Sequence, residues 1–236
     1  MQRFSNFVIL ITLLSIAPFV WSFNSIKVGY IERAPHIYAN ADGSVRGMTG
    51  KTLVSLFRRA NVEVEMISTD QEDISSFIKT PSLDAFITTQ TLIINPNNFV
   101  YSAKPLFSLQ FYLYHLKSEQ EIQTLSNLTE VSITLPLPLT AIKGPLKEHI
   151  INPKNSISVV ADGLSLPSQF AMLRNEKARY AISYLGESNA AMTFSSGFDR
   201  GDINVSKLFV LPMYLVIRRD NPNADEIMSK INLAND

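Results

Sequence analysis

The segment Ile26-Lys27-Val28-Gly29-Tyr30 is the first of four short motifs that decide the fold of this chain. Its residues alternate as in a β-strand. The second motif contains Asp42-Gly43, a pair typical of a tight turn, and the third is an apolar strand with one polar residue, Asp84. The later motifs are Asp42-Gly43-Ser44-Val45-Arg46-Gly47-Met48, Ser82-Leu83-Asp84-Ala85-Phe86-Ile87 and Tyr101-Ser102-Ala103-Lys104-Pro105-Leu106-Phe107.

The chain around these motifs alternates between predicted strands and helices. Strands that are joined by helices form a parallel sheet with helices on both faces, so we expect an α/β unit here. Thr49 is placed to cap the first of these helices. The expected strands are 26–30, 62–67 and 83–87, and the expected helices are 50–60 and 74–79.

Polar and aromatic residues follow these strands at their carboxyl ends, where open α/β sheets bind ligands. The segment 30–36 follows the first strand, and Ser68-Thr69 follows the second. A dense group of hydroxyl and amide side chains follows the third strand, and it is the strongest local indication of a ligand site. This group consists of Thr88, Thr89, Gln90 and Thr91.

A second α/β pattern follows a long aromatic strand at 109–116. Another long strand, at 208–219, leads back to a helix at 223–231. Two α/β units joined by two extended strands predict two lobes and a hinge, which suits closure around a ligand. The elements expected between the long strands are strands at 131–135, 156–160 and 179–185 and helices at 142–150 and 166–175.

The four motifs, together with Met213 to Pro222, resemble the periplasmic solute-binding proteins of the amino-acid ABC-transport type, extracellular solute-binding protein family 3. The resemblance is weakest between Thr129 and Lys207. It implies the α/β, two-lobed type II periplasmic binding fold, in which each lobe is a mostly parallel sheet flanked by helices and two hinge strands join the lobes. The implied division is a signal peptide at 1–22, lobe 1 at 23–111, lobe 2 at 112–209, and a return strand and helix to lobe 1 at 210–236.

This sequence departs from the family where the family holds an amino acid. The family's Arg, which forms a bidentate pair with the ligand carboxylate, is replaced by Asn95, which carries no charge. The position of the family's carboxylate for the ligand amine falls near Leu185. Glu187 either takes that role or is a solvated loop acid. These changes argue against the usual amino-acid ligand.

The second lobe also departs from the family, whose first strand there runs into a Gly-Thr turn. Here Pro136 and Pro138 remove two backbone donors, and only Thr140 keeps a hydroxyl. We therefore expect a more apolar wall on this side of the ligand site.

Arg33 lies where the family often places an aromatic residue over the ligand. It either anchors an anion or pairs with Glu32 or water. Tyr30 and Tyr38 could supply aromatic cover, as in many small-molecule sites, although Tyr38 is equally well explained by packing.

The bulk composition is that of a globular protein, with 46% hydrophobic and 18% charged residues. The 21 basic residues balance the 21 acidic ones, so there is no basic field for nucleic acid. The absence of Cys excludes a thiol nucleophile and cysteine-based metal centres.

The N-terminus is typical of a signal peptide, with Arg3 before an apolar run at 7–20 and Val20-Trp21-Ser22 as a cleavage site. The run of 14 residues is shorter than the roughly 20 that a membrane-spanning helix needs. We therefore expect cleavage after Ser22 and a periplasmic location.

These observations favour a non-enzymatic solute-binding protein for a small polar or aromatic solute. We expect it to act as a monomer without cofactor or metal, and to be read by a membrane permease or sensor when closed. Two alternatives remain open: an accessory or sensor module of the same fold, and a dehydratase-like enzyme that uses Glu32 or Glu187 as its acid.

Overall fold

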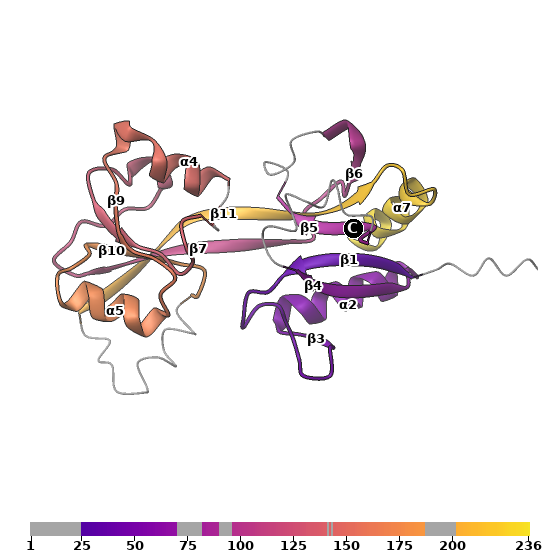
Figure 1. Ribbon diagram of the computed structural model, residues 1–236, viewed down its shortest axis with the longest axis horizontal. Coiled ribbons are helices and arrows are strands. Elements are labelled where there is room, and N and C mark those ends of the chain that lie inside the picture. Colours follow the sequence, from indigo (N-terminus) through magenta and orange to yellow (C-terminus); the bar gives the residue numbers. More distant parts are fainter. Residues whose placement is uncertain (1–24, 70–81, 90–95, 141, 143, 187–201) are drawn as a thin grey trace, which may run out of the picture.

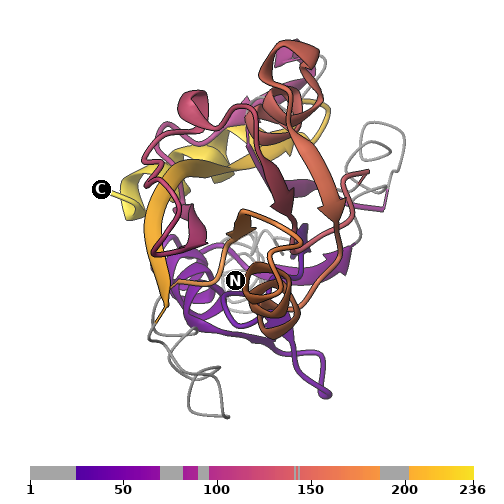
Figure 2. The same ribbon diagram turned by 90° about the vertical axis from the view of Figure 1, so that its left-hand side faces the viewer.

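The computed structural model describes residues 25–69, 82–89, 96–140, 142, 144–186 and 202–236, and it has two α/β units joined by two long strands (Figure 1). The main sheet runs continuously through both units in the strand order β4-β1-β5-β11-β7-β10-β8-β9, with β6 paired to β11. Figure 2 shows the molecule from the end of the second unit, with helix α5 (Leu166–Arg174) and strand β9 (Ser158–Ala161) in front of the first unit.

The first unit is built on three parallel strands. β1 (Ile26–Ile31) lies between β4 (Val64–Thr69) and β5 (Ala85–Thr88), and all four residues of β5 are buried. Asp84, directly before β5, is held to β1 and to Asn221, because its carboxylate accepts hydrogen bonds from the Lys27 amide at 2.9 Å and from Asn221 Nδ2 at 3.3 Å. Asp84 is thus a structural residue.

A small hairpin and a helix cover one side of this unit. The hairpin pairs β2 (Tyr38–Ala39) with β3 (Val45–Arg46) across the Asp42-Gly43 turn. Helix α2 (Met48–Arg59) follows and buries Leu53, Leu56 and Phe57. The expected cap at Thr49 is wrong. Thr49 lies inside the helix, and the amides of Thr49 and Gly50 donate to the backbone carbonyl of His36 at 2.9 and 3.2 Å.

Two long strands carry the chain between the units. β7 (Phe107–Leu116) and β11 (Ile203–Arg218) pair antiparallel from Phe107↔Met213 to Leu116↔Ile203, with an irregularity between Lys207 and Phe209. The short β6 (Phe99–Tyr101), which follows a single 3₁₀ turn at Pro96–Asn98, pairs with the end of β11. The two crossings confirm the expected hinge strands.

The second unit repeats the α/β pattern. β8 (Ser132–Thr134) pairs parallel with β9 and with β10 (Tyr180–Ser183), and β10 then pairs antiparallel with β7. Helix α4 (Pro145–Ile151) and helix α5 flank this sheet. Short 3₁₀ turns at Leu125–Asn127 and Pro153–Asn155 connect the elements.

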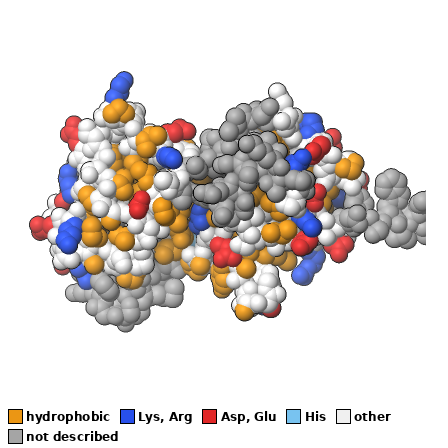
Figure 3. All heavy atoms as spheres, viewed as in Figure 1, with side chains coloured by type: hydrophobic (Ala, Val, Ile, Leu, Met, Phe, Trp, Pro, Cys, Tyr) orange, Lys and Arg blue, Asp and Glu red, His pale blue; other side chains and the backbone are white. Residues whose placement is uncertain are grey.

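Each unit has its own hydrophobic core on both faces of the sheet. The C-terminal helix α7 (Ala224–Ala234) returns to the first unit, where Ile227, Met228 and Ile231 pack with residues of β1 and α2. On the face shown in Figure 3, basic and acidic side chains are interspersed. The expected helix at 74–79 and the signal peptide at 1–22 lie outside the described residues.

Candidate functional site

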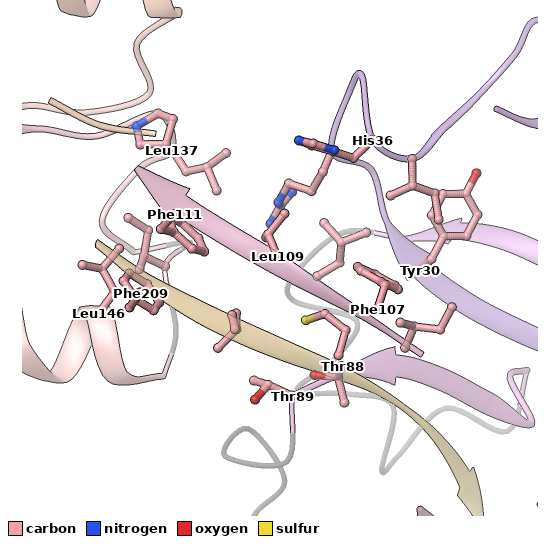
Figure 4. A pocket seen from close by; sticks show the side chains of 18 residues that line it. Tyr30, His36, Thr88, Thr89, Phe107, Leu109, Phe111, Leu137, Leu146 and Phe209 are labelled. Carbon is pink, nitrogen blue, oxygen red and sulfur yellow. The ribbon is translucent and has the colours of Figure 1, made fainter. Parts of the chain in front are cut away.

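A pocket lies between the two units and is lined by residues from both (Figure 4). Its volume is about 100 Å³, enough for several water molecules or a small solute. The first unit contributes residues after the carboxyl ends of β1 and β5, as expected for an open α/β sheet. The polar groups among them are Tyr30, Arg33, His36, Thr88 and Thr89.

Arg33 lies in a tight loop after β1. The loop is closed by hydrogen bonds from the Arg33 amide to the Ile37 carbonyl at 2.7 Å and from the His36 amide to the Arg33 carbonyl at 2.8 Å. Arg33 Nη1 donates to the backbone carbonyl of Glu32 at 2.7 Å. The side chain is half-buried, and burial lowers the pKa of its guanidinium. The carboxylate of Glu32 instead accepts from the Ala39 amide at 3.2 Å.

Tyr30, Thr88 and Thr89 are almost fully buried, with 2%, 2% and 3% of each residue exposed. Burial, and secondarily the charge of Glu32, raises the pKa of the Tyr30 phenol. The hydroxyl of Thr88 has no hydrogen-bond partner among the described residues. Because an unpaired buried hydroxyl is costly, Thr88 Oγ1 is a natural contact for a bound ligand.

The opposite wall of the pocket is apolar. Phe111 of β7 and Phe209 of β11 stack with ring centroids 4.5 Å apart and an angle of 7° between the rings. Figure 4 shows both rings beside Leu146, with Leu137 above them. The described lining residues of the second unit beyond these strands are Pro136, Leu137, Ile142 and Leu146, in agreement with the apolar wall expected from the proline-rich turn.

His36 connects the two units directly. Its Nε2 lies 3.1 Å from the backbone carbonyl oxygen of Tyr184, and the two rings contact each other with centroids 6.2 Å apart. His36 ends the segment 30–36 that was expected to lie near the ligand site. The described residues contain no cluster of three or more His, Asp or Glu side chains that could hold a metal ion.

The structure brings Tyr30, Arg33, Thr88 and Thr89 of the predicted site residues to this pocket. Two others lie outside it. Tyr38 is in β2, opposite Arg46, because the hairpin carries it away from the pocket. Thr140 is exposed in a turn whose Leu139 amide is held by the Asp162 carboxylate at 2.8 Å. Gln90, Thr91, Asn95 and Glu187 lie outside the described residues.

Sequence reasoning missed the aromatic wall and the His36 contact. The aromatic run at 109–116 predicts a hinge strand and does not by itself indicate a pocket wall. Nothing local marks Phe209, because its role depends on the register of β11 against β7.

The sequence matches no protein-family model and no curated protein. Solved structures are similar to it in fold. The GluR0 ligand-binding core in complex with L-glutamate has a TM-score of 0.60 at 11% identity, covering 89% of this chain and 91% of its own. An ancestral arginine-binding protein bound to arginine has a TM-score of 0.57 at 15% identity, with 89% and 90% covered.

The substrate-binding protein of an amino acid ABC transporter has a TM-score of 0.56 at 12% identity, covering 90% of this chain and 92% of its own. None of the helices in the described part of the chain has the length and apolar character to cross a membrane. The expected resemblance is therefore confirmed at the level of architecture, and the chain has the two-lobed type II periplasmic binding fold.

Proposed function

We propose that this protein is a solute-binding protein that captures a small solute between its two lobes. The observation that carries the proposal is a pocket lined by both units and crossed by the two strands that join them. Closure of two lobes about such strands is a common mode of ligand capture. Residues 23–111 and 210–236 would form one lobe, and residues 112–209 the other.

The site would use Arg33, Thr88 and Thr89 as polar contacts and Tyr30 as part of the wall. Gln90, Thr91, Asn95 and Glu187 stay predictions as further ligand contacts. Of the two acids considered for an enzymatic role, Glu32 accepts a hydrogen bond from the Ala39 amide and is not among the pocket's lining residues, and Glu187 lies outside the described residues. We therefore propose a binding role rather than a catalytic one.

The biological setting follows from the same proposal. A signal peptide at 1–22 would deliver a monomeric protein to the periplasm, and the closed form would be read by a membrane permease or sensor. The likeness to the substrate-binding protein of an amino acid ABC transporter supports a transport role. A ligand that binds the closed form better than the open form would shift the population toward closure.

A ligand screen with two matched variants tests this function. Thermal melting is measured with amino acids, polyamines, organic acids and aromatic metabolites for the wild type, Leu109→Trp and Leu233→Trp. Leu109 lines the pocket, whereas Leu233 is 74% exposed on α7. A ligand should raise the melting temperature of the wild type and of Leu233→Trp, but not of Leu109→Trp. No stabilisation by any compound, or equal stabilisation of both variants, would contradict the proposal.

A further inference from the structure

The charges around the pocket are unequal. Among the described residues that line it, Arg33 is the one permanently charged side chain, and His36 is the one other side chain that can carry a positive charge. The same lining residues include no Asp and no Glu. This part of the pocket can therefore pair with an anion, but it offers no carboxylate to a ligand ammonium group.

Arg33 is available for such an anion. Within the described part of the chain it forms no ion pair, and its Nη1 hydrogen bond goes to a neutral backbone carbonyl, that of Glu32. A half-buried guanidinium remains charged, because arginine is protonated at every physiological pH. It presents five N–H donors in a planar fork that suits a carboxylate. A ligand carboxylate would supply the missing counter-charge.

A second polar group lines the same pocket. Thr88 lies at the end of β5, is 2% exposed and has no hydrogen-bond partner for Oγ1 among the described residues. Figure 4 shows Thr88 and Thr89 side by side along the pocket. A hydroxyl can donate to a ligand oxygen as well as accept, so Thr88 fits a carboxylate or a carbonyl oxygen without needing an ammonium group.

The remaining surface of the pocket fits an apolar body. The stacked rings of Phe111 and Phe209 and the side chains of Leu137 and Leu146 form one end of it. Phe111 and Leu146 are buried, so contact with a ligand here would be made away from water. Burial of apolar ligand surface against such a wall is favourable.

We propose that the pocket binds a small monocarboxylic acid with an aliphatic or aromatic body and without an amino group. The carboxylate contacts Arg33 and Thr88, and the body packs against Phe111, Phe209 and Leu146. This inference rests on the proposed solute-binding function and specifies its ligand. It distinguishes this protein from the structural neighbours that were solved with L-glutamate and arginine.

Three compounds with the same phenyl ring test the class directly. They are 3-phenylpropanoate, L-phenylalanine and 2-phenylethylamine, which carry a carboxylate alone, a carboxylate with an ammonium, and an ammonium alone. Affinities are measured by isothermal titration calorimetry. We expect 3-phenylpropanoate to bind at least about tenfold more tightly than the other two, because the described lining of the pocket offers a ligand ammonium no carboxylate. The aliphatic set of 4-methylpentanoate, L-leucine and 3-methylbutylamine should give the same order.

The failure of this inference differs from the failure of the proposed function. L-Phenylalanine or 2-phenylethylamine binding as tightly as 3-phenylpropanoate would overturn the ligand class and leave the binding function intact. An absence of binding for both acids would also overturn the class, while another compound of the wider screen could still bind between the lobes. An absence of binding for every compound of that screen would contradict both the ligand class and the proposed solute-binding function.

Variants at Arg33 test whether its guanidinium contacts the carboxylate of the ligand. Arg33→Met should weaken 3-phenylpropanoate at least about tenfold, and Arg33→Lys, which keeps the charge but loses the fork, should weaken it less. Arg58→Met, at an exposed position of α2, removes the same charge and should leave the affinity unchanged. Unchanged binding of the acid by both Arg33 variants would overturn the assignment. If Arg33→Met does not fold, Arg33→Lys decides the question.

Discussion

The imidazole of His36 and the backbone carbonyl of Tyr184 form a direct hydrogen-bonding contact between the two lobes, with Nε2 and the oxygen 3.1 Å apart. His36 belongs to the loop after β1, and Tyr184 follows β10. The carbonyl of His36 also accepts from the first amides of α2. One residue thus links the loop of Arg33, a helix of the first lobe and the edge of the second lobe. In the proposed binding cycle this contact would favour the closed arrangement of the lobes.

Loss of this contact should weaken closure. His36→Ala removes a hydrogen bond worth about 1 kcal/mol, so ligand affinity should fall roughly fivefold. Small-angle X-ray scattering should show a larger radius of gyration for the ligand-free variant. Tyr184→Phe keeps both the carbonyl and the ring, and it should behave like the wild type. Equal scattering and affinity for His36→Ala and the wild type would show that the contact does not hold the lobes together.

The unpaired hydroxyl of Thr88 predicts opposite effects on stability and binding. Thr88→Val removes a buried polar group without a partner, so the free energy of unfolding should stay the same or rise by about 1 kcal/mol. Affinity for a carboxylate ligand should fall. Thr134 is a matched control, since its hydroxyl is also buried without a hydrogen-bond partner among the described residues, and Thr134 does not line the pocket.

Thr134→Val should therefore have the same effect on urea unfolding and no effect on affinity. If both variants lose affinity, or if neither does, the hydroxyl of Thr88 is not a specific contact of the ligand.

Gly47 makes a separate prediction about the loop that carries Arg33 and His36. Gly47 has a φ of 87°, and a Cβ there would overlap the backbone carbonyls of Pro35 and His36. Gly43 has a similar φ of 78°, but a Cβ there would meet nothing within 4 Å. Gly47→Ala and Gly43→Ala both place a Cβ on a backbone with positive φ, which costs on the order of 1–3 kcal/mol, and only Gly47→Ala adds the steric overlap.

We expect Gly47→Ala to unfold at clearly lower urea concentration than Gly43→Ala and to bind ligand more weakly. Gly43→Ala should bind like the wild type. Equal midpoints for the two variants would show that the loop after β1 can shift to make room.

The fold could be predicted because short stretches of sequence specify its individual strands and turns. The alternation of β1, the Asp42-Gly43 turn and the apolar strand around Asp84 each specify one element, and their order specifies the parallel sheet.

The site was only partly predictable. The rule that ligands bind beyond the carboxyl ends of strands indicates Tyr30, Arg33, Thr88 and Thr89, which all line the pocket.

The other contacts of the site depend on how the strands pair and on how the two units pack. Phe111 and Phe209 meet because β7 and β11 pair at that point, and His36 meets Tyr184 because the loop after β1 lies beside the end of β10 in the fold. No local pattern contains these relationships. Tyr38 shows the converse, since it follows β1 closely in sequence but pairs with Arg46 in a hairpin outside the pocket.

The pH dependence of ligand binding should come from protonation of the carboxylic acid ligand and not from Arg33. Burial lowers the pKa of Arg33, but arginine stays protonated at every physiological pH. A free monocarboxylic acid has a pKa of about 4.3, like a Glu side chain, and pairing with Arg33 lowers the pKa of the bound acid. The binding free energy is therefore fully present above the pKa of the free acid. It is lost as the pH falls toward the pKa of the bound acid.

Calorimetry with 3-phenylpropanoate between about pH 3.5 and 8.5 checks this sign, since Kd should rise about tenfold per pH unit below the pKa of the free acid. Circular dichroism at each pH confirms that the protein is folded. The imidazole of His36 also lines the pocket, so the profile is repeated with His36→Ala, and the part due to the ligand acid should persist. Affinity that increases on acidification in both proteins would mean that the neutral acid is the bound form, and Arg33 would then have no role as its counter-charge.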